Sequence, residues 1–90
     1  MLSLVIRYKL KEQQSSYRQL ALKSQLGYNT VLNVANGLNR PRFDVFQELV
    51  FQLELTPDEV MLCTDKRYED LDDASLIAIL KDFYANERPA

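Results

Sequence analysis

The sequence predicts an all-α fold, and three features of its 90 residues indicate this. Only two glycines and three prolines are present, too few for the turns of a sheet. Apolar residues recur at a spacing near 3.6 rather than 2, which is typical of helices that bury one face. Capping patterns also precede several apolar segments. With 47 % hydrophobic residues, we expect one globular unit with a modest core and no strands.

The first predicted helix covers residues 2–13, because its apolar residues fall on one face. The positions expected to face inward are Leu2, Val5, Ile6 and Leu10. The positions expected to face outward are the bases Arg7, Lys9 and Lys11.

The segment from Ser16 to Gly37 predicts two short helices joined by a tight turn, the pattern of a DNA-binding helix-turn-helix. A capping box from Ser16 to Gln19 begins the helix at 17–24, in which Leu20 and Ala21 face inward. The next helix, 28–36, has an apolar stripe of Val31, Val34 and Ala35, preceded by Leu26. Its opposite face carries Tyr28, Asn29, Thr30, Asn33 and Asn36. Gly37 can take the positive φ that ends this helix, and Pro41 prevents it from resuming.

Three further helices follow the linker at residues 38–42. Residues 44–53 carry Phe46, Leu49, Val50 and Leu53 at core spacing. Thr56, Pro57 and Glu59 form a capping box with proline at the first helical position, which predicts a short helix at 57–62. Asp72 or Asp73 caps the last helix, 74–85.

Charge is distributed unevenly along the chain, although the net charge is only −2. Residues 1–42 hold seven bases and one acid, a net of +6. Residues 43–90 hold four bases and twelve acids, a net of −8. This asymmetry indicates one face suited to a polyanion and another turned away from it, the alternative being ordinary solvated helix faces.

Several classes of function lack their chemical parts in this sequence. There is no histidine, no glycine-rich phosphate loop and only one thiol, so we expect neither an enzyme nor a metal or cofactor site. The four acids within residues 69–73 lack the spacing of a calcium loop. Cys63 is expected to be a small buried apolar side chain. No apolar run is long enough for a signal peptide or a membrane span, so we expect a cytoplasmic protein.

Taken in order, these elements resemble the Cro and cI type of phage-repressor helix-turn-helix family, also known as the xenobiotic-response-element family. The shared pattern is a capped helix, Leu-Ala, a turn, a recognition helix ending in Asn-Gly, a proline, a leucine-rich helix and a short capped helix. Its counterparts here are Ser16, Leu20 and Ala21, Asn36 and Gly37, Pro41, residues 43–55 and residues 56–60.

The resemblance implies a five-helix lambda-repressor-like DNA-binding domain over residues 1–63, with the motif at about 16–37. The acidic extension, residues 64–90 with its helix at about 74–85, lies outside the match. We expect it to belong to the same globular unit.

Two features depart from the family pattern. Gln25 stands where the family's turn usually has glycine, and a left-handed backbone there costs another residue about 1 kcal/mol. We therefore expect Gly27 to give the turn a different path. The family also links its first and third helices through a buried Arg–Glu pair, for which this chain has Leu10 and Ala35, so no orphan charge results.

The resemblance implies that the helix at 28–36 enters the major groove, with its first residues at the base edges. By position, the base-contacting residues are Tyr28, Asn29, Thr30 and Asn33. An asparagine amide both donates to and accepts from adenine, so Asn29 and Asn33 are suited to adenines in neighbouring base pairs. Leu32 is suited to a thymine methyl or to partial burial. The alternative for the polar residues is an ordinary hydrated helix face.

Contacts to the phosphate backbone are expected at the periphery of the motif. The candidates are Tyr17, Arg18, Gln19, Asn36, Asn39, Arg40 and Arg42. Arg40 or Arg42 is alternatively suited to a narrow minor groove, which would favour A·T pairs.

One module of this size buries too little DNA to discriminate a site strongly, so we expect a homodimer on an inverted repeat with half-sites about one helical turn apart. The candidate dimer contacts are Phe51, Met61, Leu62, Leu76, Leu80 and Phe83. The wide apolar face of helix 74–85 either packs against its own chain or forms the dimer interface, and periodicity does not distinguish these.

The sequence therefore predicts a sequence-specific double-stranded DNA-binding transcriptional regulator that acts as a repressor. The competing interpretation is a protein-interaction module of the same fold, an antitoxin or an anti-repressor, that acts through the acidic C-terminal half. A phage or plasmid repressor, a restriction-modification controller and an antitoxin autoregulator are not separable from the sequence.

Overall fold

The computed structural model describes residues 1–38 and 40–87, and these residues form six α-helices and one short 3-10 helix, without strands. In chain order the α-helices are α1 (Leu2–Glu12), α2 (Tyr17–Ser24), α3 (Tyr28–Ala35), α4 (Phe43–Leu53), α5 (Pro57–Thr64) and α6 (Asp73–Glu87). The 3-10 helix η1 (Lys66–Tyr68) lies between α5 and α6. The predicted all-α class is confirmed, and each predicted helix is present within two residues of its expected ends.

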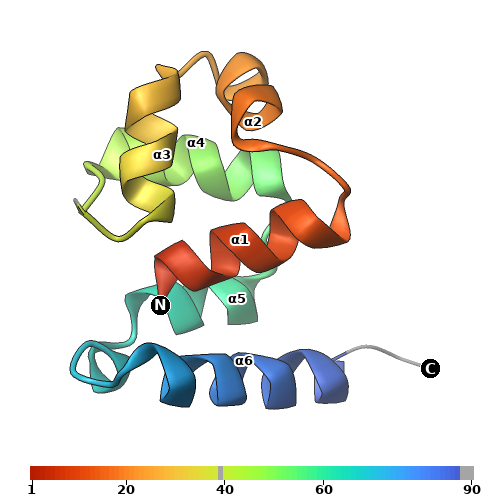
Figure 1. Cartoon of the computed structure of the whole chain (residues 1–90), viewed down its shortest axis with the longest axis vertical. Coiled ribbons are helices and arrows are strands. Elements are labelled where there is room, and N and C mark those ends of the chain that lie inside the picture. Colours follow the sequence, from red (N-terminus) through yellow and green to blue (C-terminus); the bar gives the residue numbers. More distant parts are fainter. Residues whose placement is uncertain (39, 88–90) are drawn as a thin grey trace.

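α1 is the central helix of the fold. Figure 1 shows α2, α3 and α4 on one side of α1 and α5 and α6 on the other. α1 contacts α3 and α4 as well as α5 and α6, so it is buried on two faces. Ile6 and Leu10 belong to one hydrophobic cluster, and Leu4 and Val5 belong to a second. The inward positions predicted for this helix did not include Leu4, which is only 4 % exposed.

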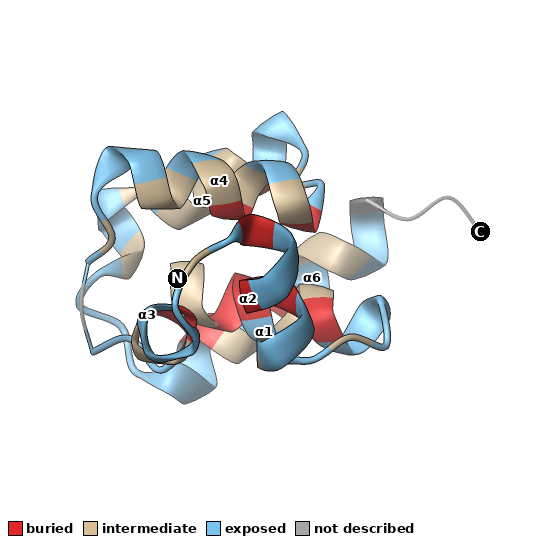
Figure 2. Ribbon diagram, turned by 90° about the horizontal axis from the view of Figure 1, so that it is seen from above, coloured by how far each residue is buried: buried red, intermediate tan, exposed pale blue. Residues whose placement is uncertain are grey.

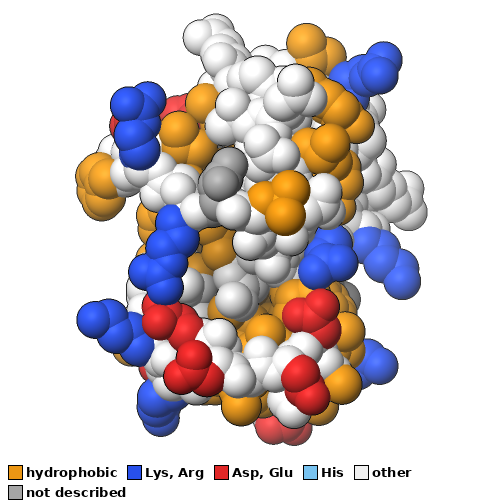
Figure 3. All heavy atoms as spheres, turned by 60° about the vertical axis from the view of Figure 1, so that its left-hand side comes forward, with side chains coloured by type: hydrophobic (Ala, Val, Ile, Leu, Met, Phe, Trp, Pro, Cys, Tyr) orange, Lys and Arg blue, Asp and Glu red, His pale blue; other side chains and the backbone are white. Residues whose placement is uncertain are grey.

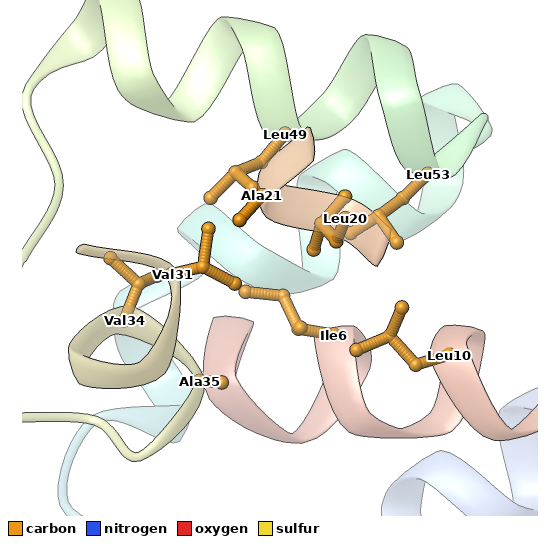
Figure 4. Packing of buried hydrophobic residues seen from close by; sticks show 9 residues of the cluster. All are labelled: Ile6, Leu10, Leu20, Ala21, Val31, Val34, Ala35, Leu49 and Leu53. Carbon is orange, nitrogen blue, oxygen red and sulfur yellow. The ribbon is translucent and has the colours of Figure 1, made fainter. Parts of the chain in front are cut away.

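The first hydrophobic cluster holds α2, α3 and α4 against α1. Its buried members are Ile6, Leu10, Leu20, Ala21, Val31, Val34, Ala35, Leu49 and Leu53. Figure 4 shows the side chains of α2, α3 and α4 converging on Ile6 and Leu10. Leu10 and Ala35 are both buried in this cluster and α1 contacts α3, so the two apolar residues leave no buried charge between these helices. This cluster fixes the orientation of α3, because three buried residues of α3 lie in it.

The local signals at the ends of α2 and α3 are present, with two corrections. The Ser16 hydroxyl caps α2 by accepting from the Gln19 N–H at 3.2 Å. The reciprocal half of the predicted box is wrong, because the Gln19 amide accepts from the Ser15 hydroxyl instead. The expected detour at Gly27 is also wrong, because Gln25 itself takes the left-handed conformation with φ 58° and Gly27 is extended with φ −65°. Gly37 ends α3 with φ 72°, as predicted.

Gln25 tolerates this backbone because the turn closes around it. The Gln25 N–H bonds to the Ala21 carbonyl, and the next N–H, of Leu26, bonds to the same carbonyl at 3.2 Å. Such a left-handed ending satisfies carbonyls that the last turn of a helix leaves unpaired, which offsets the strain of a side chain there. The tight turn between α2 and α3 therefore forms without glycine at this position.

α6 packs against its own chain. The second cluster consists of Leu4 and Val5 of α1 with Leu76 and Leu80 of α6. Partly buried residues surround these four: Met1, Tyr8, Leu55, Leu62, Cys63, Tyr68, Ile77 and Tyr84. The Asp72 side chain caps α6 by accepting from the Ser75 N–H at 2.8 Å, as one of the two predicted caps. The extension is thus a further layer on α1 and α5.

A buried ion pair ties α1 to α5 next to this cluster. The Lys9 ammonium lies 2.9 Å from a Glu59 carboxylate oxygen, and the two side chains are 13 % and 2 % exposed. The other Glu59 oxygen accepts from the Thr56 N–H at 2.8 Å, which completes the predicted capping box of α5. The prediction that Lys9 faces outward is wrong, because it shares a helix face with Val5, one turn earlier, and that face is covered by α5 and α6.

Tyr84 of α6 packs beside the buried Lys9–Glu59 ion pair. Its ring centroid lies 5.9 Å from the Lys9 ammonium and 5.6 Å from the stacked ring of Tyr8. Burial raises the pKa of the Glu59 carboxyl, but the Thr56 N–H and the Lys9 ammonium outweigh burial and hold that pKa below its ordinary value. Burial and the Glu59 carboxylate raise the pKa of the Tyr84 hydroxyl, so this hydroxyl stays protonated.

Candidate nucleic-acid interface

The outer face of α3 is polar and open. Tyr28, Asn29 and Thr30 are exposed, whereas Val31, Val34 and Ala35 on the opposite face are buried. Figure 2 shows this division along α2 and α3, with buried positions turned toward the rest of the molecule. Four uncharged polar side chains thus share one edge of the molecule when the half-buried Asn33 is included.

Asn33 and Leu32 lie at the margins of this face. Both are half-buried, so the predicted open position of Asn33 holds only in part. The backbone carbonyl of Asn33 accepts from the Leu38 N–H at 2.9 Å, and this bond closes the turn that follows α3. Of the two interpretations of Leu32, the structure shows partial burial.

Arg18 and Tyr28 bring the starts of α2 and α3 together. The Arg18 guanidinium carbon lies 5.7 Å from the centre of the Tyr28 ring, a cation–π arrangement. Arg18 is exposed and Tyr28 is 43 % exposed, so the guanidinium keeps donors available to a ligand. A base or phosphate contact by either residue would therefore be linked to the placement of the other.

The other candidates for phosphate contacts differ in how accessible they are. Gln19 and Asn36 are exposed, and Arg42 is 86 % exposed with its guanidinium 3.9 Å from Asp44. Tyr17 is half-buried and packs against the first cluster, so its ring serves the core. Asn39 lies outside the described residues.

Arg40 lies on the segment that follows α3, and it has an acidic partner. Its guanidinium pairs with the Glu69 carboxylate, although the residues are 29 positions apart in the chain. Both side chains remain accessible, at 81 % and 44 % exposure. The sequence pattern did not indicate this pair, because no local spacing relates the two residues.

The basic first half and the acidic second half of the sequence form separate charged faces only in part. On the face shown in Figure 3, Asp and Glu side chains gather in the lower part, and the upper part is mostly uncharged, with hydrophobic side chains among the white surface and Lys and Arg at its flanks. The first half supplies less unpaired positive charge to the surface than its net charge suggests, because Lys9 pairs with the buried Glu59 and Arg40 pairs with Glu69.

The candidate dimer residues divide into three groups by exposure. Leu76 and Leu80 are 7 % and 0 % exposed within their own chain, so these two candidates are buried in the second cluster and unavailable as surface contacts. Leu62 is half-buried against the same cluster, and half-buried Phe83 makes an edge contact with Tyr84. Phe51 and Met61 are 74 % and 67 % exposed, which leaves them as the open apolar candidates.

Cys63 is half-buried against the second cluster, so it is less enclosed than predicted. Burial raises the pKa of its thiol to about 12. Among the described residues no group of three or more Cys, Asp and Glu side chains is arranged to hold a metal ion. In the described part of the chain, no helix is both long enough and apolar enough to cross a membrane.

Comparisons of the chain with protein-family models, with curated proteins and with solved structures gave no match.

Proposed function

We propose that this chain is a sequence-specific double-stranded DNA-binding transcriptional regulator in which α2 and α3 act as a helix-turn-helix. The observation that carries the proposal is the division of α3 into a buried apolar face and an exposed face of Tyr28, Asn29 and Thr30. An α-helix of this kind fits the major groove, where an asparagine amide distinguishes adenine from the other bases. The flanking Arg18 and Arg42 supply charges for phosphate contacts.

We propose further that the fold is of the Cro and cI type, lambda-repressor-like over α1 to α5. The order of the helices, the tight left-handed turn after α2 and the glycine at the end of α3 support this assignment. On this assignment α6 is an addition that covers α1 and α5. The chain then acts as a homodimer on an inverted repeat, as a repressor, without cofactor or catalytic activity.

Selection of bound sequences from a random duplex pool, followed by binding titrations on the selected duplex, tests the proposal. Asn29→Ala removes a candidate base contact, so we expect affinity to fall by about 1–3 kcal/mol, with relaxed preference at one base pair. Asn86→Ala is the matched control, because Asn86 is also an exposed amide and lies on α6. An unenriched pool, or an Asn29→Ala variant that binds and discriminates as the wild type does, would exclude this function.

The salt dependence of binding gives a second, independent measurement. Six bases of the first 42 residues are exposed in the described part of that segment: Arg7, Lys11, Arg18, Lys23, Arg40 and Arg42. If about six phosphates are neutralised, the log–log slope of affinity against salt is near −5. A slope near zero would show that the protein does not engage the backbone.

A protein-interaction module is the second candidate, and one observation favours it. Phe43, Phe51 and Met61 expose 78 %, 74 % and 67 % of their surface on α4 and α5. Exposed apolar side chains of this size suit a protein partner, in an antitoxin or an anti-repressor. This candidate predicts no measurable duplex binding in the same titrations.

A further inference from the structure

Glu69 is an acidic side chain that pairs with a proposed DNA-contacting arginine, and it comes from the acidic extension rather than from a neighbouring position. Its carboxylate pairs with the guanidinium of Arg40, on the segment between α3 and α4. A phosphate group would compete for the same donors, because carboxylate and phosphate oxygens bind a guanidinium in the same way. The charges on Glu69 and on a bound phosphate would also repel each other.

The two partners are each held in place by local structure, so the pair is built into the fold. On the Glu69 side, Asp65 accepts from the Arg67 N–H at 2.9 Å, and its carboxylate also pairs with the Arg67 guanidinium at 2.7 Å. The Glu69 N–H then bonds to the Lys66 carbonyl at 3.2 Å and closes η1 directly before the acid.

On the Arg40 side, Gly37 takes φ 72° and the Leu38 N–H bonds to the Asn33 carbonyl at 2.9 Å. These contacts turn the chain away from the end of α3. The segment that carries Arg40 consequently meets η1, which belongs to the acidic extension.

The charged residues next to Glu69 in the chain have other partners or none in the described part of the chain, so Glu69 is the one among them that pairs with Arg40. Arg67 is already paired with Asp65, and Asp72 caps α6 by accepting from the Ser75 N–H. Asp70 is exposed, and its side chain forms no ion pair or hydrogen bond with the described residues, although it is adjacent to Glu69. Glu69 thus differs from Asp70 in a single respect that matters here, its contact with Arg40.

We infer that Glu69 is an intramolecular competitor that lowers the affinity of the chain for duplex DNA by occupying Arg40. The inference rests on the proposed DNA-binding function and adds a role for the acidic extension. In the wild type the Glu69 carboxylate stays paired with Arg40 and repels the duplex, so no phosphate is neutralised at Arg40; once Glu69 loses its charge, Arg40 binds one further phosphate. The extension then sets how many phosphates the chain neutralises, in addition to covering α1.

Glu69→Gln tests the inference, because glutamine keeps the shape of the side chain and removes its charge. On the duplex selected with the wild type, we expect Glu69→Gln to bind about threefold to fivefold more tightly at low salt. We expect its log–log salt slope to be steeper by about 0.9, the value for one more neutralised phosphate. Its thermal midpoint should stay within a few degrees of the wild type, since exposed ion pairs contribute little to stability.

Asp70→Asn is the matched control, because it changes the net charge equally at an adjacent exposed position. We expect it to raise affinity by about twofold or less, since salt screens a charge that makes no contact. Two further variants complete a double-mutant cycle: the single variant Arg40→Gln, and the double variant that carries both Arg40→Gln and Glu69→Gln. In the Arg40→Gln background, adding Glu69→Gln should change the affinity by no more than Asp70→Asn does. It should leave the salt slope unchanged.

The possible results distinguish failure of the competitor role of Glu69 from failure of the proposed DNA-binding function. If the wild type binds the selected duplex and Glu69→Gln gains no more than Asp70→Asn, the competitor role is wrong and the DNA-binding function stands. A gain that persists in the Arg40→Gln background also overturns it, because the effect would then be general. If the wild type binds no duplex, the proposed function fails and the competitor role fails with it.

Discussion

Replacing Lys9 with methionine removes the cation that faces the Glu59 carboxylate and keeps a side chain of similar length. The carboxylate is 2 % exposed, and the ammonium lies 2.9 Å from it. Removing one partner of a buried ion pair commonly costs about 3–5 kcal/mol, since the remaining charge is unpaired and poorly hydrated. Lys9 is 13 % exposed, so we expect the lower end of this range.

Protonation of Glu59 limits the part of this cost that comes from the unpaired charge. A carboxyl group with an ordinary pKa of about 4.3 lies about 2.7 units below pH 7, and each unit corresponds to about 1.36 kcal/mol, so neutralising Glu59 costs about 3.7 kcal/mol. At pH 5 the same limit is about 1 kcal/mol. We therefore expect Lys9→Met to lose about 3 kcal/mol of unfolding free energy at pH 7 and about 1 kcal/mol at pH 5.

Urea denaturation at both pH values measures the effect. For a domain of this size, the loss at pH 7 corresponds to a fall in the thermal midpoint of about 12–24 °C. Lys11→Met is the matched control, since Lys11 is exposed on the same helix, and it should cost about 0.5 kcal/mol or less. Adding Glu59→Gln to Lys9→Met should recover most of the loss, because glutamine still accepts from the Thr56 N–H. A loss below about 1 kcal/mol at pH 7, or one independent of pH, would refute this account of the pair.

Three further outcomes are expected. Gln25→Gly should stabilise the fold by about 0.5–1 kcal/mol in urea denaturation, because Gln25 has φ 58°, whereas Gln19→Gly within α2 should destabilise it by about the same amount. If Gln25→Gly is destabilising, the left-handed turn is not where α2 ends. Leu80→Ala should cost about 2–5 kcal/mol because Leu80 is fully buried between α6 and α1, whereas Phe51→Ala at an exposed position should cost about 0.5 kcal/mol or less. Equal losses for these two variants would contradict the packing of α6 on its own chain. The Cys63 thiol has a pKa of about 12, so a thiol reagent at pH 8 should label it slowly in the folded protein and rapidly in urea. Because this pKa is raised on folding, Cys63 adds stability below its ordinary pKa of about 8.5 that is lost as the pH rises toward 12. Equal labelling rates in the two states would show that the thiol is open.

Local signals predicted the helices because each signal acts within a few residues. Ser16 and Thr56 cap α2 and α5 as expected, and Gly37 ends α3 with a positive φ. The apolar positions of α2 and α3 were identified for the same reason, since the helical repeat alone decides which residues share a face. The open polar face of α3 follows from this repeat.

Contacts between distant segments were not predictable in the same way. Lys9 was expected outside because bases favour water, and only the arrival of α5 and α6 on that face makes it a buried partner of Glu59. Leu76 and Leu80 have a periodicity that suits a dimer equally well, and the packing of α6 on α1 removes that option. The sequence also did not indicate that Tyr17, a candidate for phosphate contact, packs against the first cluster.

The sequence by itself determined the helices, their caps and the polar face of α3, because helical repeat and capping depend on residues fewer than five positions apart. The tertiary structure decided that α1 is buried on two faces, that Lys9 is enclosed with Glu59, and that Arg40 meets Glu69. These contacts join residues far apart in the chain, and their partners are fixed by how complete helices fit together in space.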